Sequence, residues 1–215
     1  MLYSVKYWDA ALFVIKEKCA ENFLLKTIIY RTNSAIGRGI RGRENVRVQW
    51  NRNSKLSYTP QFLTLDNTPW FPLMGEIHYS RVSNGRWEEE LYKMKAGGIE
   101  LVSAYTIWIH HEEVEGEWDF SGDRDLRKFL QTIKNCGLHC ILRIGPWAHG
   151  EVRNGGFPDW LMQKEKEGQL VTRTNDTKYL RYVREFYGKI AEQARGLLLS
   201  DDGPVAMIQI ENEYG

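Results

Sequence analysis

The chain has 215 residues, of which 42% are hydrophobic and 27% are charged, and its formal net charge is +1. These proportions are ordinary for a globular protein, and no apolar run approaches the ~18 residues that a membrane span needs. We therefore expect a soluble protein with no membrane partner, in a compartment that the sequence leaves open.

The first 55 residues differ from the rest in charge. They contain 11 Lys and Arg against 4 Asp and Glu, whereas the remaining 160 residues contain 18 against 24. Their apolar run at residues 10–15 is shorter than the ~7 to 15 residues of a signal-peptide core, so we expect no signal peptide. The basic stretch at residues 38–43 is typical of a solvated arm, and no basic helix face indicates a nucleic-acid partner. We predict that residues 1–55 form a poorly ordered extension.

A short β-hairpin is expected next. Apolar residues at 62–65 and 69–71 flank Asp66 and Asn67, which tolerate the left-handed conformations of a tight turn. Such a hairpin would cover the bottom of a larger sheet.

Strands and helices then alternate four times. Expected strands cover residues 73–79, 101–105, 140–144 and 205–210. One expected helix ends at Gly97-Gly98, the next two cover residues 123–136 and 159–164, and a long last one contains an apolar stripe from Leu180 to Ala194. We expect Ser83 or Asn84 to cap the first helix and Asn175 or Asp176 the last. This alternation favours a parallel α/β sheet, and no Gly-rich phosphate turn follows the first strand.

The predicted fold is therefore α/β, a (β/α)₈ TIM barrel of which the first four βα units are present. A complete barrel takes ~250 residues, and the strand and helix pattern here fills about half of one. We expect residues 56–215 to be the N-terminal half of a catalytic barrel, following the extension at residues 1–55.

Glu213 is the strongest candidate for catalysis. It follows the apolar run at residues 205–210, and the carboxyl end of a barrel strand is where catalytic groups lie. Burial there would raise its pKa and suit it to donate a proton. Asn212 beside it could bind a sugar hydroxyl, and a solvated strand end is the alternative.

Further polar residues follow the earlier strands. Glu151 could accept bonds from sugar hydroxyls beside a stacking face on Trp147, or could pair with Arg153. Tyr105 could donate a hydroxyl to the mouth of the barrel or could simply fill it. Arg143 needs a carboxylate partner at the end of a buried strand, which Glu76 or Glu213 could supply.

No metal site is expected. His110 and His111 are adjacent on a segment that we expect to be extended, so their side chains would point to opposite sides, and no third ligand follows at zinc-like spacing. The three cysteines, Cys19, Cys136 and Cys140, make no disulfide framework, and we expect them to be packed in the core.

Six ordered segments together resemble glycoside hydrolase family 35, the β-galactosidase family of clan A. The segments are Gly75-Glu76-Ile77-His78-Tyr79-Ser80-Arg81, residues 105–112, Arg143-Ile144-Gly145-Pro146, residues 151–161, Arg173-Thr174-Asn175-Asp176 and Ile210-Glu211-Asn212-Glu213-Tyr214. The resemblance implies a (β/α)₈ barrel and a retaining exo-glycosidase that removes terminal β-galactosyl residues without a cofactor.

The resemblance also implies roles for individual residues. Glu213 would be the proton donor and later the general base, and Asn212 would bind the 2-hydroxyl. Tyr105 and Glu151 would hold the galactosyl hydroxyls, helped by the backbone of His149 and Gly150.

The chain departs from the family pattern at residues 107–109 and at the pair His149 and Gly150. The family's nucleophilic Glu follows strand seven, and no residue here is assigned that role, so we expect the chain alone to be inactive. The alternatives are a non-catalytic galactoside-binding protein and a family member that acts on another β-glycoside. The partner is in each case a sugar, and the oligomeric state is left open.

Overall fold

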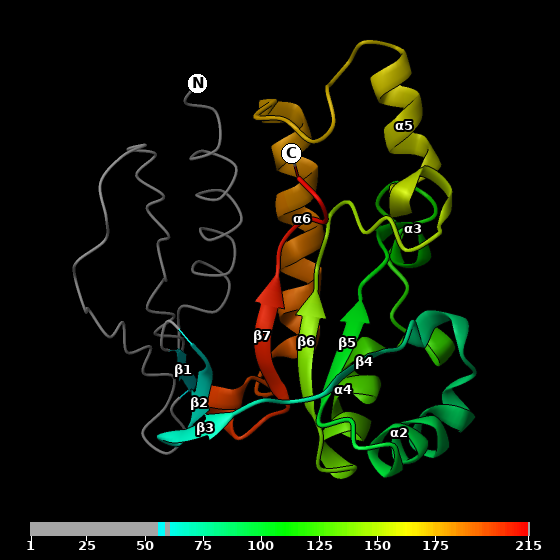
Figure 1. The fold of residues 1–215 in the computed structure, drawn as a ribbon. Helices are drawn as coiled ribbons and strands as arrows, with labels where there is room; N and C mark the ends of the chain where they lie inside the picture. Colours follow the sequence, from blue (N-terminus) through cyan, green and yellow to red (C-terminus); the bar gives the residue numbers. More distant parts are fainter. Residues whose placement is uncertain (1–55, 59–60, 215) are drawn as a thin grey trace, which may run out of the picture.

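The computed structural model describes residues 56–58 and 61–214. Figure 1 shows a small sheet beside a larger one whose strands run side by side. The predicted disorder of residues 1–55 lies outside the described residues and stays a prediction. Among the helices of the described ranges, none is both long enough and apolar enough to cross a membrane.

The small sheet is antiparallel and contains the expected hairpin. Its strands are β1 (Leu56–Tyr58), β2 (Leu63–Leu65) and β3 (Thr68–Trp70), in that order. Asp66 and Asn67 join β2 to β3 with φ angles of 50° and 65°, which are the left-handed values that a two-residue hairpin turn requires. The hairpin prediction is confirmed.

The small sheet covers the amino end of the larger one. Leu56 packs with Leu199 and Ala206 in one apolar cluster, against which the Trp70 ring also lies. The Trp70 indole donates a hydrogen bond of 3.1 Å to Glu100, just before a strand of the larger sheet. The opposite, carboxyl edge of that sheet is left open for the polar residues described below.

The larger sheet is four-stranded and parallel. Its strands are β4 (Met74–Glu76), β5 (Leu101–Tyr105), β6 (His139–Arg143) and β7 (Val205–Gln209), in consecutive order. Consecutive order means that every connection returns to the neighbouring strand, which is the arrangement of successive βα units. The parallel α/β prediction is confirmed, and the bounds of β5 are those expected from the sequence.

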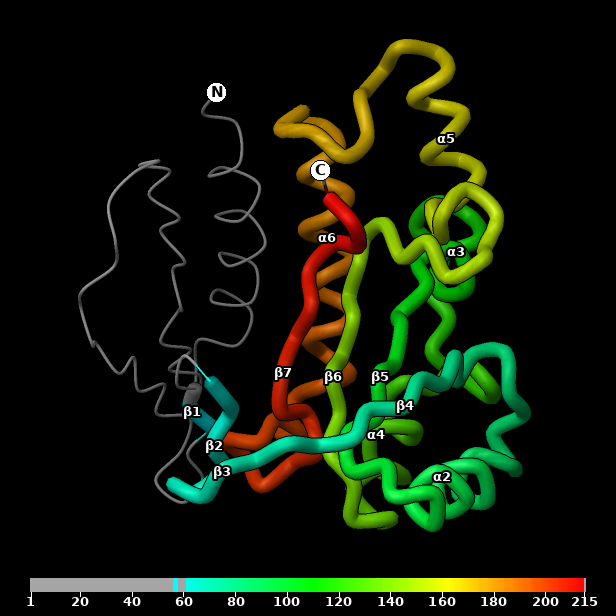
Figure 2. The backbone as a smooth tube through the Cα atoms, in the orientation of Figure 1, coloured from blue at the N-terminus to red at the C-terminus, as the bar shows by residue number. Residues whose placement is uncertain are grey.

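Three helices of the connections cover one face of this sheet: α2 (Trp87–Ala96), α4 (Leu126–Asn135) and α6 (Thr177–Ala194). Helix α5 (Asp159–Lys166) lies instead beyond the carboxyl ends of the strands (Figure 1). Figure 2 shows α4 and α6 behind the strands. Leu142 of β6, Phe129 of α4 and Tyr187 of α6 belong to one buried cluster, so the main core lies between the sheet and these helices.

One of the two helix caps expected from the sequence is found. Asp176 caps α6 by accepting hydrogen bonds from the backbone N–H groups of Lys178 and Tyr179, and Gly137 follows α4 with a φ of 66°. The expected cap of α2 is wrong, because a 3-10 turn (Asn84–Arg86) separates Ser83 from the start of the helix.

The segment around His110 is helical rather than extended. Trp108–His111 form the short helix α3. Nδ1 of His111 donates to the Asp119 carbonyl oxygen at 2.9 Å, so its Nε2 accepts from the Tyr79 hydroxyl at 2.6 Å. Nδ1 of His110 lies 2.8 Å from the Ser80 hydroxyl. These imidazoles therefore join α3 to the turn after β4.

The buried histidines should make stability depend on pH. Burial lowers the pKa of His110 and of His111 to about 4, whereas the unfolded value is about 6.5. The unfolded chain therefore binds more protons between these two values, so stability is fully present above about pH 6.5 and falls as the pH drops toward 4. We expect the melting temperature to fall across this window, less steeply in His111→Asn.

The control for this prediction is His149→Asn, because His149 is exposed and asparagine also tolerates its positive φ of 58°. Its pH profile should match that of the unmodified chain. An identical slope in His111→Asn would contradict the assignment.

Candidate active site at the carboxyl edge of the sheet

The carboxyl ends of the four parallel strands bring polar side chains to one edge. Glu76 ends β4, Tyr105 ends β5 and Arg143 ends β6, while Asn212 and Glu213 follow β7 by three and four residues. Parallel pairing sets Tyr105 directly beside Arg143. Residues that are far apart in the sequence therefore meet at the edge where α/β folds bind ligands.

Arg143 is the centre of this cluster. Its Nη1 donates to Glu76 Oε2 at 2.5 Å, and its Nη2 donates to Asn212 Oδ1 at 2.7 Å. The guanidinium carbon lies 3.7 Å from the centre of the Tyr105 ring. Of the two carboxylates that the sequence offered as a partner for Arg143, the structure has Glu76 in that position.

Tyr105 and Asn212, two of the predicted binding residues, are both buried and contact each other. The Tyr105 hydroxyl donates to Asn212 Oδ1 at 3.0 Å. Burial raises the pKa of Tyr105, Arg143 opposes this, and the negative charges of Glu76, Glu213 and Glu151 add to the rise. The negative charges of Glu213 and Glu151 thus both raise the pKa of the Tyr105 hydroxyl, so the two carboxylates lie near it.

Glu213 itself is exposed. Its φ is +48°, and the preceding Glu211 has a φ of +60°. The burial that we expected around the Glu213 carboxyl is not found among the described residues, where β7 is the last strand of the parallel sheet and no further described strand pairs with its outer edge. Its role as proton donor remains a prediction.

Arg173 anchors the segment after β7, a function that the sequence did not assign. Its Nη2 donates to the carbonyl oxygens of Asn212 and Glu213 at 3.0 and 3.2 Å and lies 3.2 Å from Glu211 Oε2. Burial raises the pKa of Glu211, and hydrogen bonds to its carboxylate together with the charge of Arg173 oppose the rise. One guanidinium therefore holds three successive residues in place.

The loop after β6 has an unusual backbone at the predicted binding residues. His149, Gly150 and Glu151 have φ angles of 58°, 48° and 49°. The Glu151 carbonyl oxygen accepts a hydrogen bond of 3.1 Å from Arg81. Left-handed backbone at non-glycine residues gathers at functional sites. The loop thus presents an exposed Glu151 carboxylate beside the cluster.

The alternative that Glu151 pairs with Arg153 is wrong. Arg153 pairs with Asp159 at 2.8 Å and not with Glu151. The Trp147 ring lies against Gly155 on one side, and the guanidinium carbon of Arg173 is 5.0 Å from its centre. The ring therefore packs the loop, and its stacking on a sugar stays a prediction.

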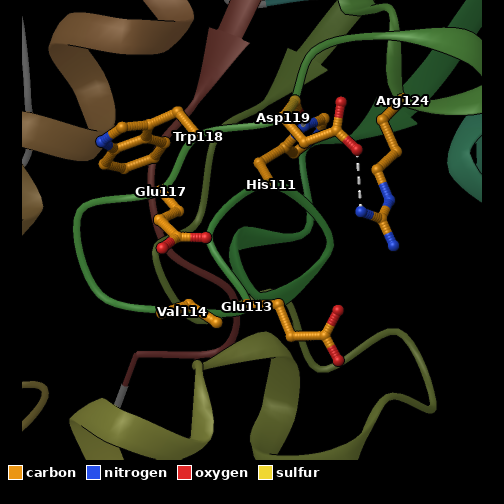
Figure 3. A pocket seen from close by; sticks show the side chains of 7 residues that line it. All are labelled: His111, Glu113, Val114, Glu117, Trp118, Asp119 and Arg124. Carbon is orange, nitrogen blue, oxygen red and sulfur yellow. Dashed lines mark hydrogen bonds and ion pairs between the residues drawn. The ribbon is translucent and has the colours of Figure 1, made fainter.

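A separate hollow of about 250 Å³ lies in the connection after α3. Figure 3 shows Glu113, Glu117 and Trp118 around it, with Asp119 and Arg124 paired at 2.9 Å. Its buried polar side chain, His111, already uses both ring nitrogens. The hollow therefore offers no buried group that lacks a partner, whereas Nε of Arg143 at the strand edge is buried and has none among the described residues.

Comparison with known proteins identifies one family over most of the chain. The model of glycosyl hydrolases family 35 matches residues 62–215. The β-galactosidases of Mus musculus and Homo sapiens are each 37% identical over 164 residues, which is 76% of this chain and 25% and 24% of those proteins. The chain thus spans about a quarter of the length of these curated relatives.

A solved structure shares the fold. The crystal structure of β-galactosidase from the psychrophilic Marinomonas ef1 superposes with a TM-score of 0.50 at 20% identity, covering 67% of this chain and 22% of that one. At this identity the likeness concerns the path of the backbone alone.

The packing of Trp147 on Gly155 can be tested by one methyl group. A Cβ at Gly155 would lie 2.2 Å from Trp147 Cζ3, whereas a Cβ at Gly122, which has a similar φ of 56°, would meet nothing within 4 Å. We expect Gly155→Ala to lower the free energy of unfolding by about 1 to 3 kcal/mol more than Gly122→Ala. Equal losses in urea unfolding would show that the ring moves aside at no cost.

Proposed function

The chain belongs to glycosyl hydrolase family 35, and we propose that its strand-edge cluster is the proton-donor side of a retaining exo-β-galactosidase site. In this proposal residues 56–215 form the first four βα units of a (β/α)₈ barrel. The consecutive parallel order of β4 to β7 supports it, since successive barrel strands are neighbours. The names of the 37% identical relatives support the choice of sugar.

The observation on which the proposal rests is the contact between the ends of β5 and β7. Tyr105 donates to Asn212 at 3.0 Å, so the residue before Glu213 is fixed at the strand edge. An amide beside a proton-donating carboxyl suits a sugar, because the amide can bind the 2-hydroxyl while the acid serves the neighbouring glycosidic oxygen.

The proposed reaction proceeds in two steps. A carboxylate attacks the anomeric carbon while Glu213 donates its proton to the departing oxygen, so that the glycosidic bond breaks and a covalent galactosyl ester forms. Glu213 then takes a proton from water, which attacks the same carbon and releases galactose. The two carboxyl groups should lie ~5 to 5.5 Å apart.

The attacking carboxylate is expected to come from strand seven of the barrel, beyond the four strands described. Glu76 is unsuited because it is paired with Arg143, and Glu211 is buried against Arg173. On this proposal the 215-residue chain binds galactosides without hydrolysing them.

The other predicted residues would hold the sugar. The exposed Glu151 carboxylate can accept bonds from two hydroxyls, and the left-handed turns at His149 and Gly150 bring their backbone close to the cluster. Tyr105 would contact a hydroxyl from the buried side.

Replacing Glu213 tests the assignment. Residues 62–215 are grafted in place of the matched quarter of the mouse relative, which restores the remainder of a barrel. We expect Glu213→Gln to lower kcat for lactose by about 10²- to 10⁴-fold with little change in KM, because the leaving sugar needs a proton. The kcat for a dinitrophenyl galactoside should fall far less in this variant, since the leaving group of that substrate departs as a stable anion without a proton.

The matched control is Glu117→Gln, an exposed carboxylate of the separate hollow, which should leave both rates unchanged. Near-normal hydrolysis of lactose by Glu213→Gln would remove Glu213 from the acid role.

A further inference from the structure

The guanidinium of Arg143 is bound at both of its terminal nitrogens. Nη1 faces Glu76, and Nη2 faces Asn212. Glu76 is itself held from two other directions, by the Ser103 hydroxyl at 3.2 Å and by Nε2 of His78 at 3.1 Å. Arg143 is therefore fixed in direction by an anchored carboxylate, and its second nitrogen has little freedom to turn.

This arrangement fixes which way the Asn212 amide points. Arginine donates hydrogen bonds and cannot accept them, so the Asn212 atom that faces Nη2 must be the oxygen. The Tyr105 hydroxyl donates to the same oxygen. A flipped amide would bring its NH₂ group against a guanidinium 2.7 Å away, which is repulsive.

The amide nitrogen of Asn212 is consequently turned away from Arg143 and Tyr105. Nδ2 makes no hydrogen bond with the described residues, and it is not among their buried unpartnered atoms. Two donor hydrogens are thus presented to a ligand at the strand edge. Tyr105 has its proton committed to Asn212 and can offer a ligand only its oxygen lone pairs, so it acts as an acceptor.

We propose that Arg143, anchored by Glu76, is a positioning residue that sets the direction of the Asn212 amide and thereby the selectivity for a sugar with a 2-hydroxyl. The inference rests on the proposed function and adds to it a residue that need not touch the sugar. A purely structural ion pair would stabilise the sheet equally whichever sugar is bound, whereas a positioning role links Arg143 to one hydroxyl.

The test measures that link with the 215-residue chain itself. Affinities for methyl β-galactoside and for its 2-deoxy analogue are measured by NMR titration, and the side-chain NH₂ signals of Asn212 are followed. We expect the unmodified chain to prefer the 2-hydroxy sugar by about fivefold, which corresponds to one neutral hydrogen bond. Arg143→Lys replaces the planar guanidinium and its several fixed donors with a single ammonium group. This variant should reduce the preference to about onefold, and its Asn212 signals should be shifted even before sugar is added.

Glu76→Gln is the second variant, because it keeps the size of the anchor and removes its charge. It should reduce the preference in the same direction, and a variant that merely destabilises the fold would weaken both sugars alike. The control is Arg124→Lys, which alters an arginine paired with Asp119 away from the strand edge and should retain the fivefold preference.

The outcomes separate the two claims. A folded Arg143→Lys chain with the full preference and unmoved Asn212 signals overturns the positioning role. If the unmodified chain binds neither sugar, the proposed function fails. Asn212 signals that stay unmoved in both Arg143→Lys and Glu76→Gln would overturn the positioning role whether or not a sugar binds.

Discussion

The ion pair between Arg143 and Glu76 is the constraint on which the strand edge depends. It joins the end of β6 to the end of β4 across β5, so one ion pair links the carboxyl ends of three neighbouring strands. The guanidinium of Arg143 is mostly buried whereas Glu76 is exposed, so the cost of removing charge from water falls on Arg143, and its hydrogen bonds to Glu76 and Asn212 offset it. Glu76 is itself held by Ser103 and His78. The pair thus holds the β7 loop against the sheet.

The loops at this edge are held in conformations that they would not adopt alone. Glu151, Glu211 and Glu213 all have positive φ angles, at a cost of about 1 to 3 kcal/mol for each such residue. Arg173 offsets part of this cost by binding three successive residues, and the Tyr214 hydroxyl donates back to its carbonyl oxygen at 3.1 Å. The edge is therefore shaped by interactions between loops more than by the strands alone.

Local features of the fold could be predicted from the sequence, because each has a short-range cause. The hairpin turn at residues 66–67, the cap at Asp176 and the bounds of β5 depend on a few neighbouring residues. The pairings of Arg153 and Trp147 could not be predicted, since they were decided by where other segments lie. The helical form of Trp108–His111 was missed for the same reason, as its histidines bond to the turn after β4.

The candidate site shows the same division. Its residue types were recognisable because polar side chains after strands point to binding, and Tyr105 does meet Asn212. The direction of the Asn212 amide was not predictable, because it is set by a guanidinium 69 residues away in the sequence. The Asn212 amide, which must keep one orientation, is held by the guanidinium of Arg143. Glu213, which must gain and lose a proton in the proposed reaction, is exposed beside it, so one strand end supplies both a fixed donor and an exposed carboxyl group.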